Sequence, residues 1–364
     1  MRRIWFCLLL CAALLLPVGL LAQDEPGNLS LNPLTGLPMP DPARLEQRPI
    51  VAKMSNAPPL VRPQSGVGQA DLVFEHYAEG GLTRLSGVFH SVLPTRVGSV
   101  RSGRLIDYEL AAMYQALLAF SGGSTGVEER IYGSEALGIV EARQQAGQPT
   151  LPPSDFAERA YKGVLYGPPY YYRDPAIPVP HNMFTDLNAL SALAAADGVG
   201  AMPGLNGEMT FNAEVPAGEV GPANTLDVRY RATRVQWFYD EASGLYERMS
   251  DGQPHYDANT NERVTAENVV VIYADHSFTD IVESEWQGNR SYSIQIKTWF
   301  EGDALVVRDG RYYEARWQRP TRESLLWLET VDGERLALKP GQTWFQLVRL
   351  PEQMTPESEW VRVE

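Results

Sequence analysis

The sequence is almost without cysteine, and this absence limits its chemistry. Of 364 residues only Cys7 and Cys11 are cysteines, and both lie in an apolar N-terminal run. A chain that loses this run on export has no thiol for a disulfide, a thiolate metal site or a cysteine nucleophile. Its five histidines are scattered, without the spacing of a histidine metal site. We therefore predict no metal and no cofactor.

Two ligand-binding motifs are absent or incomplete. No GK[ST] sequence is present, which excludes a nucleotide-binding P-loop. The loop that begins at Asp257 has the first ligand positions of an EF-hand, but Glu262 stands where the motif needs glycine and Asn268 where it needs glutamate. A β-hairpin turn explains this loop better than a calcium site does.

An excess of positive charge is also missing. The chain carries 31 Lys and Arg against 45 Asp and Glu, a formal net charge of −14. Loss of Arg2 and Arg3 with a leader leaves 29 basic residues against 45 acidic ones, or −16. Such a surface repels nucleic acid and anionic lipid, so we predict no nucleic-acid partner.

The N-terminus has the layout of an export signal. Two arginines precede an apolar run that ends near Ala22, and polar residues follow. Residues 1–22 are predicted to be a signal peptide or an uncleaved N-terminal anchor, and residues 23–44, rich in Pro, Asn and Asp, an extended tether. No later stretch is apolar enough to span a membrane. We expect an extracytoplasmic protein that is secreted or held at the membrane by its N-terminal segment only.

The remaining chain divides by pattern into two parts, which together predict the α+β class. Residues 45–200 alternate between helical and strand patterns, including a hairpin signal at Gly80-Gly81, and predict a mixed α/β layered N-terminal domain. Residues 201–225 are rich in Gly and Pro and are predicted to be a linker. Residues 226–355 contain short alternating runs separated by turn signals, which predict a β-rich C-terminal domain.

Several segments resemble a known family in the same order along the chain. They are "NPLTGLP", "RPIVAKMSN", "RPQSGVGQADLVFEHYAEGGLTRLSGVF", "RVGSVRSGR", "GGS", "PHNMFT", "YERMSDGQPHYDANTNERVTAENVVVIYA" and "LKPGQTWFQLV". Over about residues 32 to 350 the chain is similar to the YerB-like family of bacterial envelope lipoproteins. The resemblance implies an envelope location and a two-domain plan, and no established activity. The chain departs from the family in having no lipobox cysteine where the signal run ends.

A cluster of arginines stands out in this acidic chain. Arg96, Arg101 and Arg104 lie within nine residues in "RVGSVRSGRLIDYEL". We predict a helix with Ser102 as its N-cap and Arg104 in its first turn, where cations are disfavoured by the helix dipole. One hypothesis is that these groups, with Arg84, hold a phosphate or carboxylate. The alternative is internal pairing, of Arg104 with Asp107 or Glu109 and of Arg84 with Glu75 or Glu79.

A glycine-rich turn is the second candidate. In "AFSGGSTGVEERI" a buried strand leads through Gly122, Gly123 and Ser124 into a helix, so its amides could hold an anion. The same letters fit G-x-S-x-G, which would make Ser124 a hydrolase nucleophile with His181 and Asp174. An ordinary tight turn is the competing explanation.

A Pro- and Tyr-rich loop supplies the third candidate. It leads into "VPHNMFTD", where His181 and Asn182 could bind a ligand or fix the end of the loop. The tyrosines at 170–172 could stack on a sugar or pack onto the body.

Together these patterns predict an exported envelope protein of unknown activity that binds an anionic envelope glycan or lipid phosphate, or serves as an accessory module. One alternative is an envelope phosphotransferase or hydrolase with Glu75 or Asp107 as acid or base. The other is a scaffold for an envelope protein partner.

Overall fold

The computed structural model describes residues 30–364, so the predicted signal or anchor and the first part of the tether lie outside the described residues. From residue 31 onward the predicted tether is wrong, because this segment packs on the body. Leu34 is fully buried, and the amide of Asn32 donates a 2.8 Å hydrogen bond to Asp71. No helix within residues 30–364 is long and apolar enough to cross a membrane.

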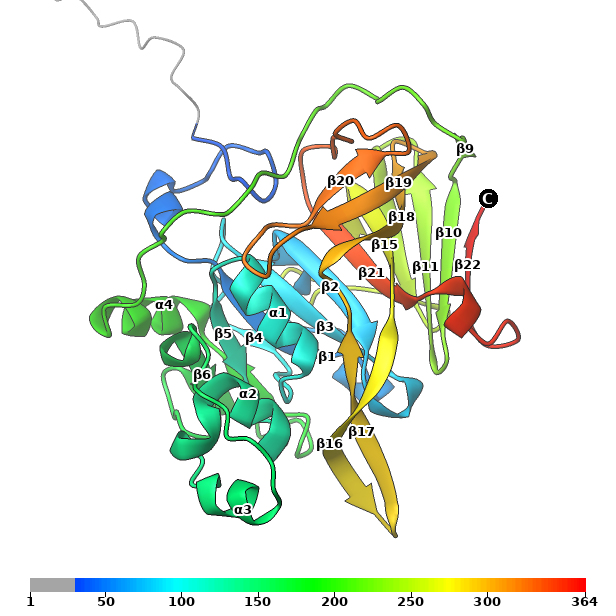
Figure 1. The fold of residues 1–364 in the computed structure, drawn as a ribbon. Coiled ribbons are helices and arrows are strands. Elements are labelled where there is room, and N and C mark those ends of the chain that lie inside the picture. The colour runs from blue at the N-terminus through cyan, green and yellow to red at the C-terminus, as the bar shows by residue number, and fades with distance from the viewer. Residues whose placement is uncertain (1–29) are drawn as a thin grey trace, which may run out of the picture.

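One large sheet runs through the whole molecule (Figure 1). Its strand order is β20-β19-β18-β15-β21-β2-β3-β1-β5-β6, and β9 pairs with β19 at one side. The strands from the N-terminal half are β1 (Ile50–Ser55), β2 (Leu72–Tyr77), β3 (Thr83–Phe89), β5 (Leu117–Phe120) and β6 (Ala160–Lys162). Those from the C-terminal half are β9 (Gly221–Pro222), β15 (Asn268–Ala274), β18 (Phe300–Arg308), β19 (Arg311–Arg319), β20 (Trp327–Thr330) and β21 (Thr343–Arg349).

The two halves meet within this sheet at β2 and β21. These strands pair in parallel, with Leu72 opposite Thr343 and Glu75 opposite Gln346. The β2–β3 hairpin has the predicted turn at Gly80-Gly81, within the short helix Glu79–Gly81. Gly80 adopts a φ of 72°, which glycine tolerates without strain. The N- and C-terminal parts are therefore joined by main-chain hydrogen bonds, and the predicted linker is not their only connection.

A second sheet belongs to the C-terminal half. Its order is β13-β12-β11-β10-β22, and β14 also pairs with β12. Trp237 of this sheet meets Trp344 of the large sheet edge to face, with ring centroids 5.2 Å apart. Its strands are β10 (Thr225–Tyr230), β11 (Thr233–Asp240), β12 (Leu245–Ser250), β13 (Gln253–Pro254), β14 (Thr265–Ala266) and β22 (Trp360–Val363). The layered, strand-rich arrangement confirms the predicted α+β class with a β-rich C-terminal part.

Helices cover the N-terminal end of the large sheet. They are α1 (Leu105–Met113), α2 (Thr125–Ala136), α3 (Val140–Gln145) and α4 (Leu187–Ala196), and a small sheet, β4-β8-β7, lies beside them (Val97–Gly98, Met183–Thr185, Tyr171–Arg173). Helix α1 begins after Arg104, not Ser102, because the Asp107 carboxylate accepts a 2.7 Å hydrogen bond from the Arg104 amide. This acidic cap neutralises the free amides at the helix start.

A long hairpin extends from the C-terminal half to the helices (Figure 1). It consists of β16 (His276–Trp286) and β17 (Asn289–Ile296), which pair only with each other among the described strands. The hairpin contacts α1 and α2, and Ile281 lies directly on Gly126, where a Cβ atom would meet Ile281 at 2.7 Å. It thereby brings residues near position 280 beside the predicted arginine site.

Candidate functional site

Arg104 is held by an acidic side chain. Its guanidinium makes a two-pronged ion pair with Glu79 from the β2–β3 turn, in which Nη2 lies 2.6 Å from Oε2. Glu283 of the long hairpin lies 3.6 Å away on the other side. Burial alone would lower the pKa of Arg104, but Glu79 outweighs it and raises that pKa. The predicted pairing of Arg104 with Asp107 or Glu109 is wrong, since its partner comes from another element.

Arg84 and Arg101 have no such partner. Within residues 30–364 no carboxylate lies within ion-pair distance of either guanidinium. Arg84 donates only to the Thr83 carbonyl, at 3.1 Å, and Arg101 only to the Pro180 carbonyl, at 3.2 Å. The pKa of Arg84 falls to about 10, first because the group is buried and then because Arg101 and Arg104 are close. We call Arg84, Arg101 and Arg104 the arginine cluster.

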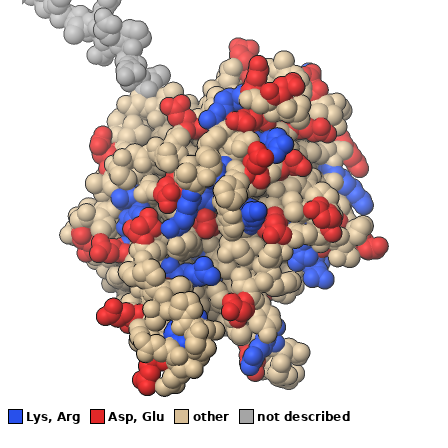
Figure 2. Space-filling view, in the orientation of Figure 1, with Lys and Arg blue, Asp and Glu red and all other residues tan. Residues whose placement is uncertain are grey.

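His181 borders this cluster. Burial lowers its pKa, and the charges of Arg101 and Arg84 lower it further, so the imidazole is neutral at pH 7. Its Nδ1 atom is buried and has no hydrogen-bond partner among the described residues. The guanidinium groups of Arg84 and Arg101 thus lack an ion-pair partner within residues 30–364, and the neutral imidazole of His181 lies beside them. Figure 2 shows basic side chains gathered near the middle of the viewed face, while acidic ones are spread across it.

Arg96 and Asn182 belong to a neighbouring loop structure instead. Arg96 forms a 2.7 Å ion pair with Asp174 and lies over the ring of Phe184, 3.6 Å from its centroid. The Asn182 side chain accepts from Arg173 at 2.7 Å and donates to the Asp174 carbonyl at 3.3 Å. These contacts fix the loop, as the structural alternative for Asn182 predicts, and they occupy both side chains.

The glycine-rich turn is largely closed by its own helix. The Gly123 amide donates to Glu128 at 2.9 Å, and Glu128 also binds Lys162 at 2.8 Å. The Ser124 hydroxyl is buried without a partner among the described residues. No hydrogen bond joins Ser124 to His181, and Asp174 is engaged by Arg96, so the predicted hydrolase triad does not form in this arrangement.

Glu75 and Asp107, the candidate acid or base residues, are both fully buried in ion pairs. Glu75 pairs with Arg248 of the C-terminal half at 2.7 Å, and Asp107 pairs with Lys53 at 2.9 Å. The Lys53 ammonium also donates to His76 at 2.7 Å. A base must be reached by its substrate, so these positions do not suit that role. The predicted pairing of Arg84 with Glu75 is also wrong.

Glu283 is the residue near the site that the sequence pattern did not reveal. It lies on the long hairpin, its side chain is 2% exposed, and its Oε1 atom has no hydrogen-bond partner among the described residues. Burial raises its pKa, and Arg104 opposes that rise. Glu283 lies far from the cluster in sequence and in a strand of ordinary polar alternation, so no local signal could have placed it there.

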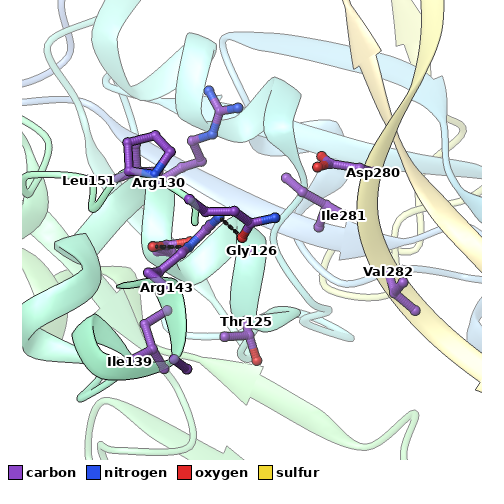
Figure 3. A pocket seen from close by; sticks show the side chains of 13 residues that line it. Thr125, Gly126, Arg130, Ile139, Arg143, Leu151, Asp280, Ile281 and Val282 are labelled. Carbon is purple, nitrogen blue, oxygen red and sulfur yellow. Dashed lines mark hydrogen bonds and ion pairs between the residues drawn. The ribbon is translucent and has the colours of Figure 1, made fainter. Parts of the chain in front are cut away.

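A cavity lies between α2, α3 and β16 (Figure 3). It has a volume of about 610 Å³ and is lined by Thr125, Arg130, Ile139, Leu151 and Asp280, among others. Arg143 on its wall is held by Glu129 and donates to Gln148 at 2.6 Å. Neither Arg84 nor Arg101 lines it. No group of three or more His, Cys, Asp or Glu within residues 30–364 is placed to hold a metal ion.

This architecture defines a two-part α+β protein whose parts share one sheet and enclose buried ion pairs. The chain belongs to the DUF3048 family of proteins of unknown function. The model of the family's N-terminal domain matches residues 34–200, and that of its C-terminal domain matches residues 226–345. The family membership confirms the resemblance found in the sequence.

Similarity in sequence and in structure to one relative supports the assignment. The chain is 26% identical over 323 residues to a Bacillus subtilis (strain 168) protein named "Putative lipoprotein YerB". The matched region covers 87% of this chain and 85% of that protein. The chain is also similar to the crystal structure of YerB protein from Bacillus subtilis, with a TM-score of 0.67 and 25% identity. That match covers 87% of this chain and 96% of the solved one. The family assigns no activity.

Proposed function

We propose that this chain is an exported cell-envelope protein that binds an anionic group at its arginine cluster. The observation that carries the proposal is the absence of a carboxylate partner for Arg84 and Arg101 within residues 30–364, although Arg104 beside them has one. Arg84 is buried and Arg101 is partly exposed, and these like charges repel each other and lose hydration, so an added counter-charge would stabilise them. A phosphate or carboxylate that accepts from both guanidinium groups supplies that charge.

The envelope location rests on two features. The relative is named a lipoprotein, and the first 22 residues here have the pattern of an export signal. Phosphorylated glycans and lipid phosphates are the abundant multivalent anions of that compartment, so we propose one of these as the ligand. Attachment to the membrane would involve the N-terminal segment only.

Binding is proposed in preference to catalysis for a physical reason. A phosphotransferase or hydrolase needs an accessible acid or base at the bound anion. Glu75 and Asp107 are buried in ion pairs, and Glu79 is engaged by Arg104. His181 borders the cluster, and its lowered pKa makes it a neutral hydrogen-bond donor or acceptor for the ligand, while Glu283 is almost fully buried.

Calorimetric titration tests the proposal with inorganic pyrophosphate and with undecaprenyl phosphate in detergent as probes. Each anion should bind the wild type and bind Arg101→Gln at least about tenfold more weakly, because one charge-assisted pair is lost. Arg84→Gln should have the same effect.

Arg130→Gln is the matched control. It removes the same charge from an exposed arginine on α2 and should leave the affinity unchanged. Equal affinity in wild type, Arg84→Gln and Arg101→Gln, or no binding of either probe, would refute anion binding at the cluster.

A further inference from the structure

A separate cavity lies where three distant parts of the chain meet. It has a volume of about 330 Å³. Its walls come from the β2–β3 turn at Glu79–Gly81, from the long hairpin, and from two C-terminal arginines, Arg231 and Arg349. The β10–β11 turn reaches the β2–β3 turn directly, since the Ala232 amide donates to the Gly81 carbonyl at 3.0 Å. The cavity is therefore built by main-chain contact between the two halves.

The first notable feature of this cavity is its unsatisfied positive charge. Arg231 is exposed, and no carboxylate lies within ion-pair distance of it among residues 30–364. Arg349 is mostly buried, and its Nε atom has no hydrogen-bond partner among the described residues. Its Nη1 atom forms an ion pair with Glu359 at 3.6 Å, and Glu359 also accepts from the Tyr77 hydroxyl and the Thr355 amide, so Arg231 carries the unpaired charge of this cavity.

The second feature is exposed aromatic surface beside these cations. Phe278 is 66% exposed and Tyr292 is 38% exposed, and both line the cavity from the long hairpin. Arg349 lies over the ring of Tyr77, 5.0 Å from its centroid, which fixes the plane of the guanidinium. Large aromatic side chains rarely stay in water without a partner when polar groups converge beside them.

The remaining charges of the cavity do not cancel the two arginines. Arg290 also lines the cavity, but it is paired with Glu285 at 2.8 Å. Glu79 lines it as well, and its charge is taken up by Arg104 on the far side. The net effect is one available guanidinium, that of Arg231, next to the exposed aromatic side chains of Phe278 and Tyr292.

We propose that this cavity is a second binding site, for a small ligand that carries a phosphate or carboxylate next to a flat or apolar ring. The anionic group would accept from Arg231, with the charge of Arg349 nearby, and the ring would pack on Phe278 and Tyr292. The volume of the cavity admits one ring and one anionic group. The site does not depend on the arginine cluster, because Arg84 and Arg101 do not line it.

Phenyl phosphate is the probe that tests this site by calorimetry. The protein titrated is the full chain with Arg84→Gln and Arg101→Gln, so that binding at the arginine cluster does not contribute to the signal. Phenyl phosphate should bind this protein at least about tenfold more tightly than inorganic phosphate or phenol alone does, because only the ester uses both halves of the site. Adding Arg231→Gln should weaken phenyl phosphate about tenfold.

The aromatic half has its own variant. Phe278→Ala combined with Tyr292→Ala should reduce the affinity for phenyl phosphate to that for inorganic phosphate. Arg335→Gln is the matched control, since Arg335 is an exposed arginine stacked on Trp327 that does not line this cavity. This substitution should leave the affinity for phenyl phosphate unchanged.

The site is overturned if phenyl phosphate fails to bind at millimolar concentration, or binds Arg231→Gln as well as the parent. It is also overturned if the aromatic double substitution leaves affinity unchanged. Arg231 and the two aromatic residues are exposed enough to replace without unfolding the protein, so these outcomes do not depend on the less exposed Arg349. The Arg101→Gln comparison in the wild-type protein separates a failure here from a failure at the arginine cluster.

Discussion

The two faces of the β2–β3 hairpin carry buried charge in contrasting ways. On one face Glu75 pairs with Arg248 at 2.7 Å, and its other oxygen accepts from Asn56 at 3.0 Å and Thr83 at 2.8 Å. On the other face Arg84 lies near two further arginines and has only the Thr83 carbonyl as a partner. The carboxylate of Glu75 has partners on several sides, whereas the guanidinium of Arg84 has no ion-pair partner among residues 30–364 and feels only the more distant charge of Glu79.

This contrast separates architecture from recognition. A buried charge that meets its opposite within the chain holds segments in place, as Glu75 and Arg248 hold the two halves. A buried charge without an opposite weakens the folded state and is relieved by a partner from solution. The same protein uses both arrangements on one pair of strands.

The largest effect on stability should come from removing Arg248, the cation that pairs with Glu75. Arg248→Met leaves Glu75 buried beside Trp237 and Trp344 without its cation, which should lower the free energy of unfolding by about 3–5 kcal/mol. Urea unfolding followed by circular dichroism measures it, and this signal is independent of the two adjacent tryptophans. The matched control is Glu75→Gln with Arg248→Met, which should recover part of the loss because no lone charge remains. A single-variant loss below about 1 kcal/mol would show that the pair is not buried as described.

The next-largest effect on stability concerns Lys53, a fully buried lysine close to Arg84 and Arg104. Burial lowers the pKa of Lys53 to about 8, and Asp107 opposes that fall. The Lys53 ammonium therefore loses its proton near pH 8 in the folded protein, whereas in the unfolded chain it loses that proton only near its ordinary pKa of about 10.4. The unfolded state binds more protons in that window, so this group makes stability rise with pH there.

Lys53→Met should remove that rise. Between pH 7 and about 9.5 the wild type should gain about 2 kcal/mol relative to this variant, from a pKa change of roughly two units. Urea midpoints at several pH values measure the difference between the two proteins, in which the ionisation of their common tyrosines cancels. Parallel pH profiles for the two proteins would contradict the lowered pKa of Lys53.

The smallest effects on stability should come from substitutions at the arginine cluster and at its partner Glu79, and these effects should have opposite signs. Glu79→Gln leaves Arg104 beside Arg84 and Arg101 with only the more distant Glu283 as an anion and should destabilise the ligand-free protein by about 1–2 kcal/mol. Arg84→Gln relieves repulsion and should stabilise it by up to about 1 kcal/mol. Thermal unfolding without added phosphate compares the two. Destabilisation by both substitutions would mean that Arg84 is compensated in the folded protein.

The sequence predicted the local features of the fold well. The hairpin at Gly80-Gly81 and the change to strand-rich structure after residue 225 follow from turn residues and alternation, which act over a few positions. The parallel pairing of β2 with β21 had no such signal, because its residues are separated by most of the chain.

The candidate site shows the same division. The unusual placement of Arg101 and Arg104 near a helix start could be predicted from the sequence, as could the position of His181 at the end of a Pro- and Tyr-rich loop. Their partners were not, because Glu79 reaches Arg104 across a turn and Glu283 arrives on a hairpin from the other half. Ion-pair partners depend on tertiary position, and spacing along one helix gave the wrong ones.

The shared sheet has a consequence for how the chain matures. A chain is synthesised from its N-terminus, and β2 must wait for β21, which forms near the opposite end. Until then the N-terminal strands present an unpaired, apolar edge of the kind that joins to other chains. Folding is expected to be slow and completed only after release of the whole polypeptide, and a chain cut short before Thr343 should aggregate. Protection of that edge by a holding chaperone would then be a condition for obtaining this protein at all.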